Sequence, residues 1–266
     1  MDEIVIILIR GVGLGAVYAL VAMSFNVVSN ASGILNFAQG NLLVLGGLCA
    51  YFVLPDDPDT GHWALGLPIA ALCLAFFHAA QGWLTLLPLR SSVEQHSWLI
   101  TTMAVSVMIG AVILVWQGPF ALNVRSPFPS FPLLGTRTPT SYPLVVALAL
   151  FWYIALAWFH RRTLTGLAMS ALAQDFEAAR AAGIHVRRLQ VLAFAISGLI
   201  IGSAGFVAAP VIKVSADSGI SYVLSGFIAA VVGGLGSNLG ALVGGPLVGV
   251  TAMFAAFRFG GQFQNA

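Results

Sequence analysis

The sequence predicts an all-α integral membrane protein: a polytopic helical bundle of about 7–8 spans, with a glycine-broken segment near the C-terminus. Of the 266 residues, 59% are hydrophobic and only 8% are charged, and the mean hydropathy is +0.96. The two longest stretches without a charged residue are 11–55 and 218–257. Each could cross a bilayer twice, since a spanning helix needs about 20 apolar residues. Lipid offers no partners to unpaired amides, so these spans must be helical.

Seven apolar segments are predicted, and they account for most of the chain. They cover 4–28, 34–54, 64–87, 98–117, 143–160, 189–210 and 224–257, the last broken by glycines. The first follows the acidic pair Asp2 and Glu3 and is predicted to be retained, because a signal peptide begins with basic residues. The polar stretches are too short for a soluble domain of about 50 residues or more, so 1–266 is predicted as a single transmembrane domain.

The distribution of charge predicts the orientation in the membrane. The segment 161–188 holds five arginines and seven of the twenty charged residues, so the positive-inside rule places it in the cytosol. Counting spans back from there puts 118–142, 55–63 and the N-terminus outside. The acidic 55–63 loop agrees with this count, whereas Arg125 and Arg137 in the other outer loop argue mildly against it.

The cytosolic segment contains a sequence typical of a short exposed helix. Its alanines favour helix, and Asp175 or Gln174 could begin the helix as a cap. Gly183 suits the left-handed residue that ends many helices. We therefore expect about two helical turns over 176–182.

The surface of that helix suits a protein partner. Glu177 and Arg180 are three residues apart and share a face, and Ala178 and Ala179 would leave a low surface on which a partner could pack. The alternative is a solvated connecting helix whose arginines only fix the topology.

Three amide side chains fall within six residues at the start of the second apolar segment. Asn36, Gln39 and Asn41 are costly there unless they pair with one another, with backbone or with a polar permeant. Asn36 and Gly40 are four residues apart and are predicted to share a helix face. We predict that the amides lie beside a solute pathway, where an amide can bond both an ammonium and a carboxylate. Helix capping and interhelical hydrogen bonds are the alternative.

Glycines recur every fourth residue near the C-terminus. Gly236, Gly240 and Gly244 predict a smooth face for close helix packing. Ser237 and Pro246 indicate a break, so this region could form two half-helices. A nucleotide-binding loop is excluded because no soluble strand precedes these glycines.

Catalytic and metal-binding patterns are not found in the sequence. His78 lies inside a predicted span with Gln81 nearby, and a bond to a neighbouring helix is the simpler explanation for it. Cys49 and Cys73 fit small buried hydrophobic residues. The net charge of +2 argues against nucleic acid as a partner. We expect no enzyme activity, no cofactor and no metal site.

Five stretches, taken in order, resemble the permease subunits of bacterial branched-chain amino-acid ABC importers. They are the glycine-rich first segment with Tyr18-Ala19-Leu20, then 33–40, Leu99-Ile100-Thr101-Thr102, 173–184 and 229–249. The resemblance covers nearly the whole chain, and the order of the motifs makes it specific. It implies a location in the bacterial inner membrane. The implied partners are a second permease subunit, cytosolic ATP-binding subunits, a periplasmic solute-binding protein and membrane lipid.

In that family a Glu-Ala-Ala-x-x-x-Gly loop docks on the ATP-binding subunit. The resemblance implies this role for Glu177, Ala178, Ala179 and Gly183, and we include the neighbouring Asp175 and Arg180 in the candidate coupling site.

The chain also departs from the family pattern. Asn41 stands where relatives commonly carry Glu, and the arginine that relatives often have near Ser170 is missing. Relatives continue past 261–265 into another helix, so this chain is expected to lack a final C-terminal helix.

These observations predict half of a translocation pathway that imports a small zwitterionic or amide-bearing solute when a partner hydrolyses ATP. Three alternatives stay open. One is import of urea or short amides by a sister family. Another is an ion-gradient transporter, which normally carries carboxylates inside its spans, whereas all acids here lie in loops or at ends. The third is an inactive, truncated membrane scaffold.

Overall fold

The computed structural model describes residues 2–54, 59–86, 97–133 and 135–259. The helices are α1 (Asp2–Ser32), α2 (Gln39–Val53), α3 (Thr60–Leu86), α4 (Ser97–Gln117), α5 (Ser141–Arg162), α6 (Leu164–Gln174), α7 (Phe176–Ala181), α8 (Val186–Ala208), α9 (Ser218–Gly233) and α10 (Asn238–Phe259). A small antiparallel hairpin joins β1 (Phe131–Leu133) to β2 (Thr136–Thr138). Among the described residues, six helices are long and apolar enough to span a membrane, namely α1, α3, α4, α5, α8 and α10. The predicted all-α polytopic bundle is therefore confirmed.

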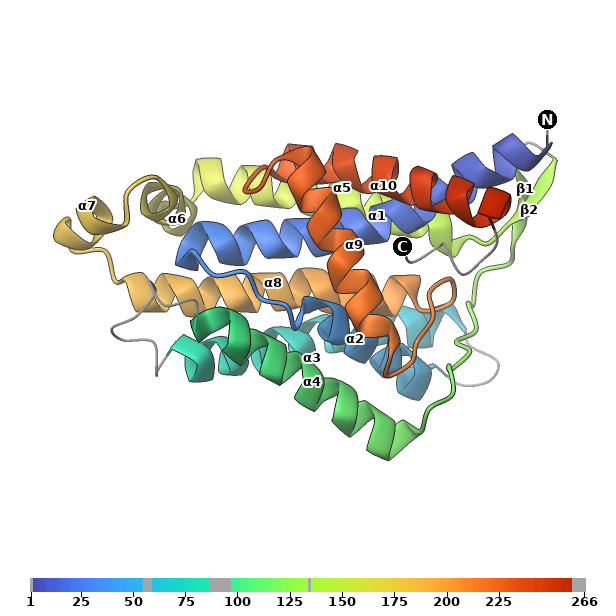
Figure 1. The fold of residues 1–266 in the computed structure, drawn as a ribbon, viewed down its shortest axis with the longest axis horizontal. Coiled ribbons are helices and arrows are strands. Elements are labelled where there is room, and N and C mark those ends of the chain that lie inside the picture. Colours follow the sequence, from blue (N-terminus) through green and yellow to red (C-terminus); the bar gives the residue numbers. More distant parts are fainter. Residues whose placement is uncertain (1, 55–58, 87–96, 134, 260–266) are drawn as a thin grey trace.

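The bundle is built around α1 and α8, which run lengthwise through its middle (Figure 1). In the most apolar 18-residue stretch of each helix, 72% of the residues of α8 and 56% of those of α1 are buried. The corresponding shares are only 22% for α4 and 17% for α5. The outer helices thus leave apolar surface for lipid or for another subunit.

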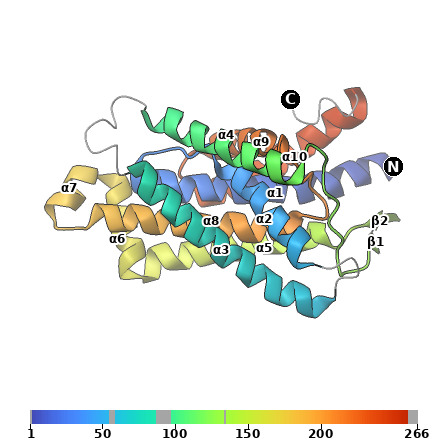
Figure 2. The ribbon, with the colours of Figure 1, turned by 90° about the horizontal axis from the view of Figure 1, so that it is seen from below.

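The ends of the bundle are distinct. Helices α6 and α7 lie at one end, and the N-terminus and the β1–β2 hairpin lie at the other, as both views show (Figures 1 and 2). This arrangement agrees with the predicted alternation of loops. Which end faces the cytosol stays a prediction.

The predicted span 34–54 is wrong at its start. Residues 33–38 are not helical, and α2 begins only at Gln39. Gly33 ends α1 with a φ of 68°, which a side chain would disfavour. Consequently Asn36 precedes the helix and does not share a helix face with Gly40.

The predicted break in 224–257 is present, with different boundaries. Helix α9 begins at Ser218, and a turn with positive φ at Gly234 and Gly236 separates it from α10. Because Gly236 lies in this turn, the helix face predicted for all three spaced glycines is wrong for Gly236. Pro246 does not interrupt the structure and remains inside α10.

Gly240 and Gly244 face α9 of the same chain. A Cβ added at Gly240 would overlap the carbonyl of Gly233, and one added at Gly244 would lie 2.5 Å from the carbonyl oxygen of Ala229. These two glycines therefore close the α9–α10 hairpin, where methyl groups would separate the helices.

A second glycine contact joins the two ends of the sequence. A Cβ at Gly15 would lie 2.5 Å from the carbonyl oxygen of Gly245. A Cβ at Gly249 would overlap the carbonyl oxygen of Gly11. Helices α1 and α10 thus approach backbone to backbone, which holds the C-terminal helix against the core.

Candidate functional site

The first candidate site is the non-helical segment 33–38 with the start of α2. Asn36 orders this segment, because its Oδ1 accepts a hydrogen bond from the amide of Ala38 at 3.0 Å. Its Nδ2 lies 2.7 Å from Nε2 of His78 and 3.3 Å from Oε1 of Gln81 on α3. An amide nitrogen can only donate, so Nε2 of His78 accepts and the imidazole is neutral with its proton on Nδ1.

Gln39 joins three helices at the first turn of α2. Its Oε1 accepts from the hydroxyl of Ser24 on α1 at 3.0 Å, and its Nε2 donates to the hydroxyl of Ser197 on α8 at 2.9 Å. All three side chains are fully buried. This network ties the short helix α2 to the central pair of the bundle.

Asn41 points away from that network toward α4 and α9. Its Nδ2 donates to the carbonyl and the hydroxyl of Ser106 at 2.6 and 2.9 Å. Its Oδ1 is buried without a hydrogen-bond partner in the described part of the protein and lies against Gly219, where any Cβ would overlap it. Asn41 also lines a groove of about 510 Å³, together with residues that include Asp217 and Ile220.

The three predicted amides therefore meet different partners in one buried region. Their exposed fractions are 0% for Asn36 and Gln39 and 3% for Asn41, so capping and interhelical bonding describe this conformation. Contact with a solute stays a prediction. Ser24, Ser106 and Ser197 were not predicted. The available signal was that each is a hydroxyl inside an apolar segment, which is too common to single out.

Two further asparagines were also missed. Asn26 on α1 donates to the carbonyl of Ser237 at 3.0 Å and accepts from the amide of Gly236 at 2.8 Å. Asn30, one turn later, donates to the carbonyl of Gly236 at 3.1 Å. Together they hold the α9–α10 turn, whose backbone groups need partners inside a membrane. Their four-residue spacing on a predicted span was the signal.

The second candidate site is the end formed by α6 and α7. The Asp175 carboxylate caps α7 by accepting from the amide of Ala178 at 2.9 Å. Gly183 has a φ of 83° and donates to the carbonyl of Arg180 at 3.1 Å, while Ile184 donates to that of Ala179 at 3.2 Å. This pair of bonds is a Schellman motif, so the predicted short helix and its glycine cap are confirmed.

The exposed face of α7 differs in one respect from the prediction. Glu177, Ala178 and Arg180 are exposed, but Ala179 is only 5% exposed and packs toward its own chain. The low surface predicted from both alanines is therefore wrong for Ala179. Helix α7 projects from the end of the bundle, as Figures 1 and 2 show, so its outer face is open to a partner.

Metal-binding chemistry has no candidate in the part of the chain that the structure describes. No group of three His, Cys, Asp or Glu side chains that could hold an ion occurs there. The buried polar side chains of the described bundle interior are amides, hydroxyls and the imidazole of His78.

A bundle of membrane-length helices with broken helices inside and an exposed helical segment at one end has the organisation of a transport permease. Sequence comparison specifies which one. The profile of the family described as "Branched-chain amino acid transport system / permease component" matches residues 7–259, and the chain belongs to this family.

Individual relatives agree with that assignment. The high-affinity branched-chain amino acid transport system permease protein LivH of Escherichia coli K12 is 26% identical over 96% of this chain and 87% of its own length. The corresponding protein BraD of Pseudomonas aeruginosa is 26% identical over 97% and 88%. The ribose import permease protein RbsC of Escherichia coli K12 is 25% identical over 88% and 73%. No solved structure gives a significant match. The chain is a multi-pass protein of the bacterial inner membrane.

Proposed function

We propose that this chain is a permease subunit of an ATP-driven importer of branched-chain amino acids. It forms half of the translocation pathway with a second permease subunit. The capped, exposed helix α7 is the observation that carries the proposal, because it presents an ordered polar surface to which an ATP-binding subunit could bind. Membership of the permease family and the names of LivH and BraD support the solute. A periplasmic solute-binding protein would deliver it at the opposite end.

The connection from α7 to the bundle interior is short. Helix α8 starts three residues after Gly183, and Ser197, the partner of Gln39, lies on the same helix. A displacement of α7 by an ATP-binding subunit would move α8, and α8 would pull on the Gln39 network. Rigid helices and discrete hydrogen-bond arrangements are the elements that transmit such changes.

Among the three amides, Asn41 is the best placed to meet a solute. It lines the groove that also contains Asp217 and Ile220, so polar and apolar groups are both at hand for an aliphatic amino acid. Asn36 and Gln39 are enclosed, and their contact with a solute requires their present bonds to exchange. We propose that this exchange accompanies opening of the pathway.

Uptake into proteoliposomes tests the proposal. The chain is reconstituted with its partner permease, ATP-binding subunits and binding protein, and accumulation of leucine, urea and ribose is compared. We expect ATP-dependent accumulation of leucine alone. A control assembly carries an ATP-binding subunit that cannot hydrolyse ATP and should show none.

Different failures would point to different alternatives. ATP-dependent uptake of urea or ribose without leucine would contradict the solute. Uptake that needs no ATP and stops when an ionophore collapses the ion gradient would instead indicate a secondary transporter.

A further inference from the structure

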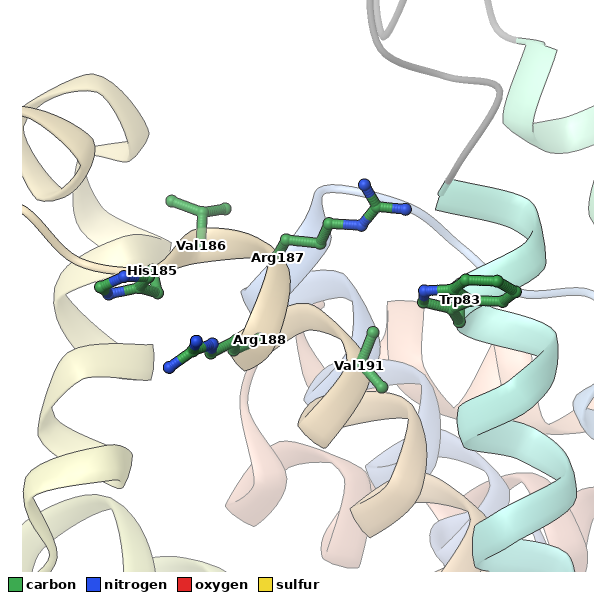
Figure 3. Close-up of a pocket in the computed structure, with 6 residues that line it drawn as sticks. All are labelled: Trp83, His185, Val186, Arg187, Arg188 and Val191. Carbon is green, nitrogen blue, oxygen red and sulfur yellow. The ribbon is translucent and has the colours of Figure 1, made fainter.

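A basic pocket of about 580 Å³ lies beside the start of α8 and the C-terminal part of α3. It is lined by Trp83, His185, Val186, Arg187, Arg188 and Val191 (Figure 3). None of these residues belongs to the amide network or to the exposed face of α7. The pocket lies at the end of the bundle from which α7 projects (Figure 1).

The positive charge of this pocket is not neutralised by the described residues. The first turn of α8 carries Arg187 and Arg188 and no acidic residue, although the N-terminus of a helix favours negative charge. The N-cap residue His185 makes no side-chain cap bond. Neither arginine pairs with a carboxylate in the described part of the chain.

Arg187 adds a specific local cost. Its Nη2 atom is buried and has no hydrogen-bond partner within the described structure. A partly desolvated guanidinium without an acceptor is unfavourable, and an anion bound to its other nitrogens would offset that cost. The other N–H groups of Arg187 can still donate single, charge-assisted hydrogen bonds to a phosphate.

The remaining wall of the pocket is apolar. Figure 3 shows Arg187 extending from α8 toward the indole of Trp83 on α3, with Val191 between the two helices. Trp83 is 51% exposed, and tryptophan is favoured where the membrane meets water. A phosphate beside Arg187 would therefore place attached hydrocarbon against Trp83 and Val191.

We propose that this pocket binds the headgroup of an anionic phospholipid. Arg187 accounts for the phosphate, since its side chain extends toward Trp83, whereas Arg188 and His185 point to the other side of α8 (Figure 3). The adjoining apolar wall accounts for a lipid in preference to free phosphate. Basic pockets between membrane helices are suited to such headgroups. Bound lipid would fix the start of α8 against α3. The test below measures lipid binding without solute or ATP, so its failure is distinguishable from failure of the proposed function.

The test is the thermal midpoint of the detergent-solubilised assembly during titration with short-chain phosphatidylglycerol. We expect a saturable rise with phosphatidylglycerol and none with phosphatidylcholine or inorganic phosphate. The double variant Arg187→Gln/Arg188→Gln should weaken the apparent affinity about 25-fold, from about fivefold for each of the two cations near a lipid surface. Arg187→Lys keeps the charge and should retain part of the effect.

The matched control is Arg161→Gln/Arg162→Gln at the end of α5. It removes the same charge from the same end of the bundle, outside the pocket, and should leave the titration unchanged. Equal losses in both double variants would overturn the proposal, because the effect would then be general surface charge. An equal response to inorganic phosphate would reject the lipid. If Arg187→Gln/Arg188→Gln releases the ATP-binding subunit and leaves the lipid titration intact, the pocket binds protein and the proposal is wrong.

Discussion

Two short polar motifs, residues 36–41 of the amide network and residues 175–183 around α7, use their hydrogen bonds in opposite ways. Asn36 and Gln39 are fully buried and form hydrogen bonds with side chains of α1, α3 and α8. Asp175 and Gly183 form hydrogen bonds that cap the two ends of α7. The side chains of Glu177 and Arg180 between them are exposed. The first region thus holds the bundle together, while the second presents a fixed surface. Mutations should separate these two roles cleanly.

The largest effect is expected at the contact between α2 and α9. In Gly40→Val the new side chain would overlap the carbonyl of Gly219. Overpacking a tight contact costs about 3 kcal/mol or more when backbone cannot move. We expect little folded protein in the membrane, measured by fluorescence size-exclusion chromatography of detergent extracts. Gly61→Val is the control, because Gly61 is exposed near the start of α3 and a Cβ there would make only ordinary contact with Asp59, at 3.4 Å or more. Normal folding of Gly40→Val would contradict the contact.

A smaller loss of stability is expected when the network loses one member. Gln39→Leu leaves the hydroxyl of Ser197 without its partner, while the hydroxyl of Ser24 keeps its bond to the carbonyl of Val21. A buried unpaired group costs about 1–3 kcal/mol. The thermal midpoint of the purified subunit should fall. Thr251→Val removes an exposed hydroxyl that bonds only its own helix and should change it little. Equal midpoints for both variants would show that the network does not stabilise the bundle.

Stability and activity per folded molecule separate a structural from a pathway role. If leucine uptake by Asn41→Leu falls further than its amount of folded protein, the groove that it lines is part of the pathway. If uptake per folded molecule is unchanged for both Asn41→Leu and Gln39→Leu, these amides are structural only.

Around α7, backbone strain at Gly183 should reduce the coupling of ATP hydrolysis to transport without destabilising the bundle. Gly183→Val forces a β-branched residue to a φ of 83°, at a local cost of about 1–2 kcal/mol. ATP hydrolysis coupled to transport should fall while membrane abundance stays normal. Gly135→Val imposes the same strain, at a φ of 82°, in the hairpin at the opposite end and is the matched control. Loss of coupling in both variants would mean that strain anywhere disturbs the assembly.

The smallest effect concerns a loop at the other end of the bundle. Hydrogen bonds from Lys213 and then Ser215 hold the pKa of Asp217 below its usual value of about 3.9. The folded state therefore binds this proton less readily, so the stabilisation is present above pH 4 or so and is lost as pH falls through the lowered pKa. Both groups are exposed, so the loss should stay below about 1 kcal/mol. Comparing the midpoints of Asp217→Asn and the unchanged chain from pH 7 to pH 3 measures it.

The sequence predicted the regions and caps better than the contacts. Hydropathy located the spans, and Asp175 and Gly183 revealed α7, because caps depend on local chemistry. Hydropathy did not reveal that residues 33–38 are a non-helical link between α1 and α2, because these residues are as apolar as those of a membrane span. Asn26 and Ser197 were missed because their partners lie 211 and 158 positions away along the chain. Such pairings depend on tertiary packing, which one sequence without its fold does not contain.

One further measurement fixes the orientation on which the coupling argument depends. A cysteine placed at Ala173, an exposed position on α6, in a background lacking Cys49 and Cys73, should react with a membrane-impermeant thiol reagent only after the cells are opened. Labelling in intact cells would place this end outside and remove α7 from contact with a cytosolic subunit.

The central claim is that the exposed face of α7 couples the bundle to ATP hydrolysis. The most direct test is solute-stimulated ATP hydrolysis per folded assembly for Glu177→Arg, with thermal stability measured on the same sample. Glu177 is exposed, so reversing its charge should leave the thermal midpoint unchanged. We predict at least a tenfold loss of stimulated hydrolysis, equivalent to about 1.4 kcal/mol of binding or activation energy. Full stimulation in a normally stable Glu177→Arg assembly would contradict the account.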